Sequence, residues 1–150
     1  MAPSSRHSFL TEEELAAWQG MLQVHAQLLR ELDVRLRAEH RLSVSEFDVL
    51  ITLFNAEGHQ LRMSALAAAI MLSPAGLTHL ATRLERDGLV ERRNDPIDRR
   101  SLLLHLTEAG AERLREARET HNALVRDRFL DRLSAAHRRG LARIWAAVLA

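Results

Sequence analysis

The sequence predicts a mainly α-helical chain in which one β-hairpin lies between the fourth and fifth of six helices. Apolar residues recur in steps of three and four over most of the 150 residues, which is the period of an amphipathic helix. Between residues 89 and 106 that period gives way to two short apolar runs around a polar turn. Residues that cap helix N-termini precede most of the helical segments. This length fits one domain, so we expect residues 1–150 to fold as a single domain.

The first helix is predicted over residues 12–40. Thr11 and Glu14 form a capping-box pattern, in which each side chain bonds the other residue's backbone amide. The seam that follows consists of Leu15, Trp18, Leu22, His25, Leu29, Leu32 and Leu36. A helix this long in so short a chain cannot bury its whole seam against its own domain. We therefore expect it to pair with a helix of a second subunit.

The second and third helices are predicted to be short. Ser43 and Glu46 form another capping box, and Gly58 is the expected end of that helix because glycine tolerates a positive φ. Its apolar face is made of Phe47, Leu50, Ile51 and Phe54. A third helix is expected over residues 64–70, where several alanines allow close packing.

The hairpin and the last two helices complete the chain. Strands are expected over residues 89–93 and 101–106, because the segment between them is rich in turn-forming residues. Thr107 and Glu108 open a fifth helix, expected to run to about residue 130. After a break, Ser134 caps a sixth helix that continues nearly to the end of the chain.

The composition excludes several classes of function. The absence of Cys rules out disulfides, Cys-ligated zinc and a thiol nucleophile. The eight His residues show no metal-ligand spacing, and the sequence contains neither a Gly-rich phosphate loop nor a nucleophile elbow. We therefore expect no enzymatic activity, no cofactor and no metal site.

The sequence also argues against a membrane or secreted protein. The longest apolar run, residues 65–72, is far shorter than the roughly 18 residues of a membrane-spanning helix. Met1–Leu10 has no long apolar stretch and leads directly into an acidic run, so it does not resemble a signal peptide. We expect a cytoplasmic protein with no membrane partner.

The third and fourth helices have the spacing of a helix-turn-helix, and the hairpin after them makes the unit a winged helix. Ser73 caps the fourth helix, predicted over residues 74–87, and Pro74 fits its first position. Leu77, Leu80 and Leu84 face inward, which leaves short and polar residues on the other faces. Thr, His and Arg side chains can donate to base edges and phosphates of double-stranded DNA. The candidate DNA-contacting residues of this helix are Ser73, Ala75, Thr78, His79, Thr82, Arg83 and Arg86.

The tip of the hairpin adds three more candidates, Asp98, Arg99 and Arg100. An Arg at a loop tip can enter a narrow, electronegative minor groove. Asp98 can accept a hydrogen bond from the Arg99 guanidinium and thereby aim it. All 21 basic residues are Arg, which suits phosphate recognition, although a genomic composition bias gives the same pattern. The alternative function is a winged-helix adaptor that binds protein through this face, but an adaptor has no need of an Arg at the tip.

Several motifs resemble the MarR family of bacterial transcription regulators. They are RLERDGLVER over residues 83–92, DPxDRR over residues 95–100 and LTEAG over residues 106–110. The resemblance implies a regulator, which we expect to be a repressor, that binds a palindromic operator as a homodimer. It implies dimerisation helices over residues 12–40 and 108–149 and a DNA-binding lobe over residues 43–107. It also implies that the fourth helix recognises DNA and that Arg99, oriented by Asp98, enters the minor groove.

The resemblance further implies a cleft for a small-molecule effector between the dimer helices and each lobe. Trp18 in a long first helix resembles a subgroup that responds to urate or small organic anions. In that subgroup a Trp, an Asp and an Arg frame the ligand, and Trp18, Asp48 and Arg92 occupy comparable places. The sequence departs from the subgroup at His79 and Leu80, where a further Arg is expected. Trp18 also fits the dimer seam, and Asp48 also fits a solvated or capping carboxylate.

Overall fold

The computed structural model describes residues 9–150, which form six α-helices, two 3₁₀ helices and three strands. In chain order they are α1 (Glu12–His40), α2 (Val44–Asn55), η1 (Glu57–His59), β1 (Gln60–Arg62), α3 (Met63–Ala69), α4 (Pro74–Arg86), β2 (Val90–Asn94), β3 (Leu102–Leu106), α5 (Glu108–Arg128), η2 (Leu130–Arg132) and α6 (Ala135–Val148). All six predicted helices and both predicted strands are present. Residues 1–8, to which much of the signal-peptide prediction applies, lie outside the described residues.

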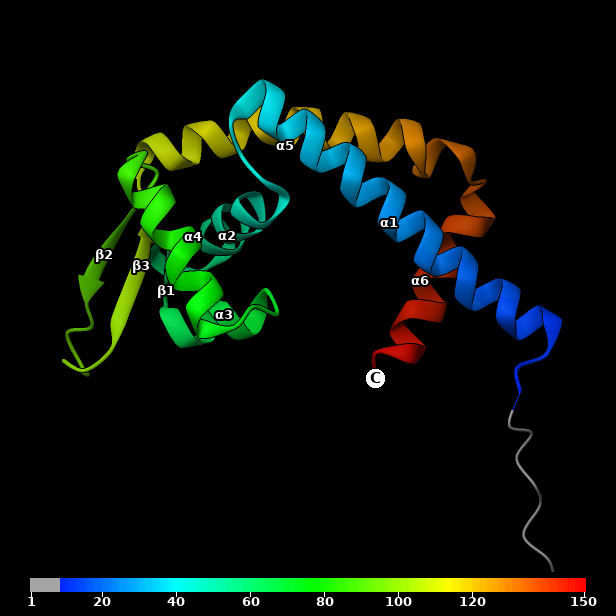
Figure 1. Cartoon of the computed structure of the whole chain (residues 1–150), viewed down its shortest axis with the longest axis horizontal. Helices are drawn as coiled ribbons and strands as arrows, with labels where there is room; N and C mark the ends of the chain where they lie inside the picture. Colours follow the sequence, from blue (N-terminus) through cyan, green and yellow to red (C-terminus); the bar gives the residue numbers. More distant parts are fainter. Residues whose placement is uncertain (1–8) are drawn as a thin grey trace, which may run out of the picture.

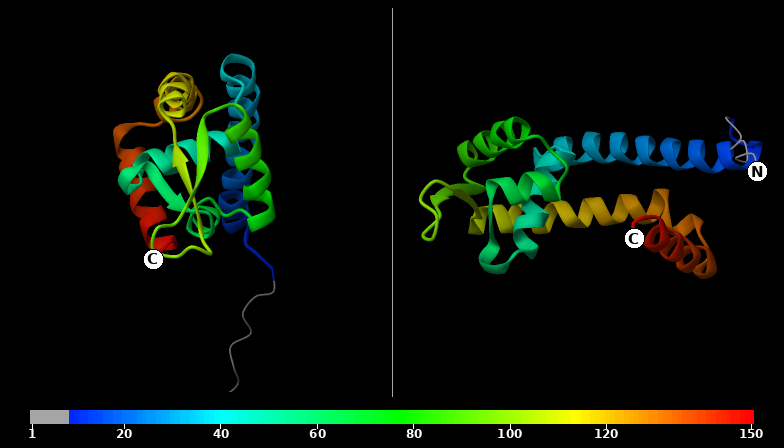
Figure 2. Two further views of the ribbon diagram at one scale, coloured as in Figure 1. Left: turned by 90° about the vertical axis from the view of Figure 1, so that its left-hand side faces the viewer. Right: turned by 90° about the horizontal axis from the view of Figure 1, so that it is seen from below.

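The chain forms a lobe with long helices that extend away from it. Figure 1 shows α2, α3, α4 and the sheet gathered at one end of the molecule, with α1 and α5 running out from that end. The second view of Figure 2 shows α1 and α5 side by side, with α6 turning back from the far end of α5. The wing, made by β2 and β3, projects from the opposite end of the lobe.

The helix starts follow the capping signals of the sequence. The Thr11 hydroxyl accepts the Glu14 amide at 3.2 Å, and the Glu14 carboxylate accepts the Thr11 amide at 2.8 Å. Ser43 and Glu46 make the same reciprocal pair at the start of α2. At the other end of α2, Gly58 is not the residue that directly ends the helix. The helix stops at Asn55, and Gly58 adopts its positive φ of 65° within η1.

The sheet contains one strand that the sequence analysis missed. Strand β1 pairs with β3 and places β3 in the centre, so that the order is β1-β3-β2 with antiparallel neighbours. Leu61 of β1 is paired with Leu104 of β3. A strand of three residues carries almost no alternation of its own, and it exists here because β3 offers a free edge.

The core lies between α2, α3, α4, the sheet and the first half of α5. Its fully buried members include Leu50, Leu53, Leu66, Leu77, Leu84, Leu104 and Leu114. Gly110 allows α5 to pass against the turn before β2, because a Cβ at this position would collide with the Leu89 carbonyl. The core therefore fixes α4 and the base of the wing against the start of α5.

The two halves of α1 differ in burial. Leu32 and Leu36 in the second half are buried. The exposed large apolar residues of the first half and of the segment before it are Phe9, Leu10, Leu15, Trp18, Met21, Leu22 and Val24. A second exposed group lies on and beyond α6 and contains Ile144, Trp145, Val148 and Leu149. Water does not favour so much apolar surface in a single chain.

Among residues 9–150, no single helix has the length and apolar content of a membrane span. Taken together, α3 and α4 have the length and apolar content of a span, but the turn between them bends the pair by 106°.

Candidate nucleic-acid interface

The turn between α3 and α4 sets the direction of the predicted recognition helix. Met71 takes a left-handed conformation with φ 55°, and Ser73 then caps α4 by accepting the Gly76 amide at 3.0 Å. Pro74 occupies the first helical position, as predicted. The bend of 106° between the helices directs α4 away from α3, so the polar face of α4 remains open.

The amphipathic face of α4 is oriented as the sequence predicts. Leu77, Ala81 and Leu84 are buried against the core, and Leu80 is partly buried. The exposed candidates are Ser73, Ala75, Thr78, His79, Thr82 and Arg86. Small residues at the N-terminal end of this face leave room for close approach of a DNA groove.

The hydroxyls of Thr78 and Thr82 are engaged inside the protein. Thr78 donates to the Pro74 carbonyl and Thr82 to the Thr78 carbonyl, both at 2.9 Å. Thr82 Oγ1 also accepts from Arg92 Nη2 at 2.9 Å. Each hydroxyl has one proton, so either threonine would have to give up its internal bond in order to donate to DNA. His79 and Arg86 keep exposed donor groups on this helix.

Arg83 of α4 is partly exposed, and its guanidinium is paired within the protein. Its Nη2 atom is 3.3 Å from Oε1 of Glu46, a carboxylate that is almost wholly buried at the start of α2. A buried carboxylate needs a partner of opposite charge, and Arg83 supplies it. The guanidinium of Arg83 thereby joins α4 to α2, a role that the sequence analysis did not predict. Arg86 at the end of the helix is 74% exposed, and its Nε lies 3.7 Å from Oδ1 of the exposed Asp87.

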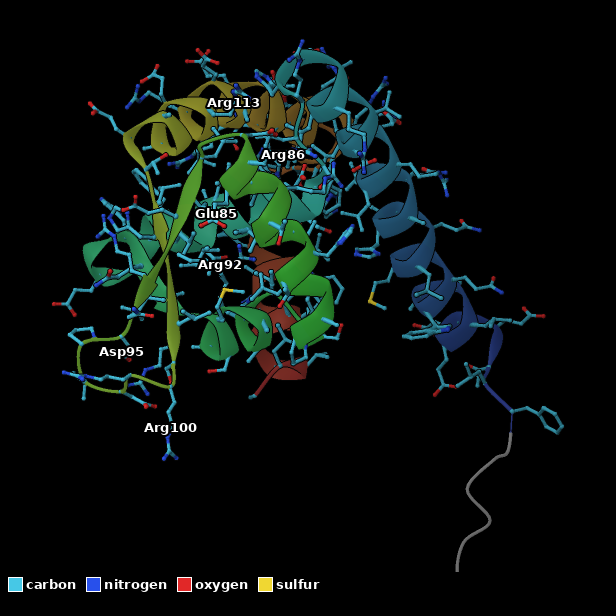
Figure 3. The ribbon with its side chains drawn as sticks, turned by 60° about the vertical axis from the view of Figure 1, so that its left-hand side comes forward. Glu85, Arg86, Arg92, Asp95, Arg100 and Arg113 are labelled. Carbon is cyan, nitrogen blue, oxygen red and sulfur yellow. The ribbon has the colours of Figure 1, made fainter. Side chains whose placement is uncertain are left out.

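Arg92 of β2 is hydrogen-bonded to α4. Its amide donates to Glu85 Oε1 at 3.0 Å, and its Nη1 donates to Glu85 Oε2. Its Nη2 donates to Thr82 Oγ1 and, at 3.2 Å, to the Thr78 carbonyl. Figure 3 shows Glu85 and Arg92 close together between α4 and the wing. The hydrogen bond from the Arg92 backbone amide lowers the pKa of Glu85, and the Arg92 guanidinium lowers it further.

A second set of contacts fixes the loop at the wing tip. Asp95 is buried, and its Oδ1 accepts the amides of Ile97 at 2.8 Å and Asp98 at 3.4 Å. Its Oδ2 accepts from Arg62 Nε at 2.6 Å, which ties the loop to β1. The Ile97 amide, together with Arg62, lowers the pKa of Asp95. The loop is therefore held by its own side chains as well as by strand pairing.

Asp98 has a different role from the one the sequence suggests. Its carboxylate accepts from the Ser101 hydroxyl at 2.7 Å and from the Arg100 amide at 3.1 Å. These two bonds lower the pKa of Asp98. Within residues 9–150 no hydrogen bond joins Asp98 to Arg99, so the expected aiming of that guanidinium is not observed. Asp98 instead shapes the backbone that carries Arg100, whose side chain points away from the body in Figure 3.

The three predicted effector residues are not assembled within one chain. Trp18, which is 52% exposed, lies on the half of α1 that extends away from the lobe. Asp48 lies on α2 close to His121 of α5, and Arg92 is bound to α4. Asp48 is exposed to solvent, but the protein around it partly desolvates its carboxyl group and raises its pKa. The charge of His121 has a smaller effect in the opposite direction. No cluster of three His, Asp or Glu residues that could hold a metal occurs in the described part of the chain.

Sequence reasoning missed the residues that hold the interface in shape, namely Glu46, Arg62, Glu85 and Asp95. One signal was available for Asp95, because an Asp before a Pro at a turn often accepts amides of the following residues. The other three depend on contacts between separate elements.

Comparison with known proteins shows the group to which the chain is related. The MarR family profile matches residues 42–102. The transcriptional repressor MprA of Escherichia coli strain K12 is 35% identical over 122 residues, which cover 81% of this chain and 69% of MprA. This chain belongs to the MarR family. The prediction of the family is thereby confirmed.

Solved structures of MarR-family regulators match almost the whole chain. AbsC of Streptomyces coelicolor is 35% identical with a TM-score of 0.87, and the match covers 94% of this chain and 95% of AbsC. Sco3205 of the same organism, solved in complex with DNA, is 29% identical with a TM-score of 0.89 and coverages of 97% and 91%. These matches confirm the winged-helix fold. MarR-family proteins are transcriptional regulators and not enzymes, which confirms the prediction that the chain is not an enzyme.

Proposed function

We propose that this MarR-family chain is a transcriptional repressor that binds a palindromic DNA operator as a homodimer and is released by a small anionic effector. The observation that carries the proposal is an exposed polar face on α4 next to a wing that ends in two exposed arginines, Arg99 and Arg100. The similarity in fold to Sco3205, which was solved with DNA, supports the same use of this lobe.

The proposed DNA contacts are narrower than the sequence suggested. His79 and Arg86 would face base edges and phosphates, and the backbone near Ala75 would approach the groove floor. Arg99 and Arg100 would reach the adjacent minor groove from the wing. Arg83 and Asp98 would act by holding α4 and the wing loop in place.

The proposed homodimer rests on the exposed apolar groups of α1 and α6. Residues 12–40 and 108–149 would supply the dimer helices, and residues 43–107 would form the DNA-binding lobe. The first half of α1 exposes a row of large apolar side chains at the seam spacing, among them Trp18 and Leu22. A second copy of the chain is the partner that covers both groups at once, since each copy brings the same surfaces.

The proposed effector is a small organic anion, and its proposed contacts, Trp18 and Asp48, would have to be brought together in the dimer because one chain does not assemble them. Trp18 offers an exposed indole with an N–H donor. Asp48 supplies a carboxyl group whose pKa is raised by desolvation. We do not include Arg92 in this proposed site, because its backbone amide and guanidinium already make four hydrogen bonds to residues of α4.

A mobility-shift experiment with DNA from upstream of the chain's own gene tests the function. We expect a discrete shift at low protein concentration that scrambled DNA of equal length does not give. Urate, citrate and aromatic acids should then be titrated into the complex, and one class of anion should release the DNA. A protein that binds neither the upstream DNA nor heparin would instead favour the protein-binding adaptor.

A further inference from the structure

The recognition helix and the wing are connected by one compact group of side chains. We call this group the wing clamp and define it as Arg92 of β2 with Thr78, Thr82 and Glu85 of α4. The three α4 residues lie four and three positions apart, so they share one face of the helix. Arg92 spans all three by donating to a carbonyl, a hydroxyl and a carboxylate.

The covalent connection between the two elements cannot by itself fix their angle. Only residues 87–89 separate α4 from β2, and Gly88 lies in this segment with φ 73°. The Leu89 amide donates to the Leu84 carbonyl at 2.9 Å, and the buried side chains of Leu89 and Val90 pack into the core, so the base of the wing is attached at the end of α4. The wing clamp adds an attachment to the side of α4, up to three residues further along the strand.

The ion pair of the wing clamp, between Arg92 and Glu85, is partly shielded from solvent. The Arg92 side chain is only 23% exposed. The Glu85 carboxylate accepts from both the backbone amide and the guanidinium of Arg92, and the forked guanidinium suits this pairing. Glu85 is partly exposed and has Arg92 as its ion-pair partner among the described residues. The Thr82 hydroxyl gives its proton to the Thr78 carbonyl and accepts from Arg92 Nη2, so the two bonds use different capacities of the same hydroxyl.

We propose that Arg92 is a positioning residue for operator recognition, which locks the wing to the recognition helix so that both bind DNA as one rigid unit. This inference rests on the proposed function. Sequence preference then depends on the fixed distance between the major-groove contacts of α4 and the minor-groove contacts of the wing. Without the clamp each element still meets phosphates, so non-specific affinity survives while the preorganised fit to the operator is lost.

The test compares three single variants with the wild-type full chain. Glu85→Gln removes the charge of the acceptor, and Arg92→Lys keeps the charge but loses the fork. Glu91→Gln is the matched control, because Glu91 pairs with Arg93 on the same strand and not with α4. Affinity for the upstream DNA and for scrambled DNA is measured by fluorescence anisotropy at one salt concentration. Hydrogen exchange of the wing amides is measured without DNA.

We expect the ratio of upstream to scrambled affinity to fall by about tenfold in Glu85→Gln and Arg92→Lys and to stay unchanged in Glu91→Gln. Wing amides should exchange faster in the first two variants only. Thr82→Val, which removes one acceptor of the clamp, should give a smaller loss of the same kind and serves if another variant fails to fold.

Two outcomes would overturn the inference. One is a wild-type ratio and wild-type wing exchange in Glu85→Gln and Arg92→Lys. The other is an equal loss in all three variants, which would mean that any change in the wing weakens binding. If wild-type protein itself fails to prefer the upstream DNA, the proposed function fails, and wing exchange still reports whether the clamp exists.

Discussion

Arg83 of the recognition helix forms an ion pair with Glu46 at the start of α2, with 3.3 Å between Nη2 and Oε1. Glu46 is buried, and its other oxygen accepts the Ser43 amide at 2.8 Å in the capping box. One residue further on, the Val44 amide donates to Asp33 of α1 at 3.0 Å. The recognition helix is thus connected through α2 to the helix proposed to form the dimer.

Removing Arg83 should destabilise the lobe. Arg83→Ala leaves the buried Glu46 carboxylate without its cation, and we expect the free energy of unfolding to fall by ~1–2 kcal/mol, the low range applying because Arg83 is partly exposed. Arg86→Ala is the control on the same helix and should change stability by less than about 0.5 kcal/mol. Urea unfolding followed by circular dichroism measures both. Equal stability of the two variants would show that the Arg83 pair contributes nothing to folding.

The wing arginines should act on DNA binding and not on folding. Arg99→Ala and Arg100→Ala each remove an exposed side chain, so stability should change by less than about 0.5 kcal/mol. Both should weaken operator binding, with the larger loss for Arg100, whose backbone Asp98 holds in place. The losses should occur on A·T-rich flanks in general, because minor-groove recognition is degenerate. Unchanged affinity of both variants at matched salt would remove the wing from the mechanism.

Asp48 should make stability depend on pH in the direction opposite to the other shifted carboxylates. Its pKa is raised in the folded protein from the ordinary 3.8, so the ionised form disfavours folding at neutral pH. Asp48→Asn should therefore raise the midpoint of thermal unfolding at pH 7. Below the ordinary pKa, Asp48 is protonated in both folded and unfolded protein, and the advantage should disappear.

Comparing the two proteins at each pH cancels the effects of Asp33, Glu85, Asp95 and Asp98, whose lowered pKa values cause an ordinary loss of stability in acid. The opposite pattern, a variant less stable at pH 7 than the wild type, would mean that ionised Asp48 has a stabilising partner, for which His121 is the neighbouring candidate.

The exposed seam of α1 should be required for assembly. Leu22→Asp places a charge in the seam and should convert the dimer to monomer at micromolar concentration, as measured by light scattering. Val34→Asp is the control, because Val34 is an exposed apolar residue of the same helix that lies off the seam. A wild-type monomer, or a dimer that tolerates Leu22→Asp, would disprove the proposed interface.

The helices could be predicted because their signals are local. Caps such as Thr11 with Glu14 act within one turn, and the apolar period of α4 identifies its buried face without knowledge of what covers it. Strand β1 could not be predicted, because three residues form a strand only when β3 is present beside them. The family motifs predicted the arrangement of these elements into a winged-helix lobe with flanking helices, which local patterns alone do not give.

The site was predicted in outline but not in detail. The sequence locates the recognition helix and the wing, but the partner of each polar side chain comes from another element. Arg83 forms an ion pair with Glu46 of α2, and Arg92 of β2 donates a hydrogen bond to the Thr82 hydroxyl. Both pairings require the packed lobe, so residue type and helical position could not distinguish a DNA contact from an internal one.

Hydroxyl-radical footprinting on the DNA upstream of the chain's own gene tests the central claim most directly. A homodimer with two recognition helices should protect two half-sites related by a two-fold axis, with centres separated by one DNA turn, roughly 34 Å, or a near multiple of it. Arg86→Ala should lose the protection in both half-sites together. Protection of a single unpaired site, or uniform protection that upstream and scrambled DNA share, would contradict a dimeric operator-binding repressor.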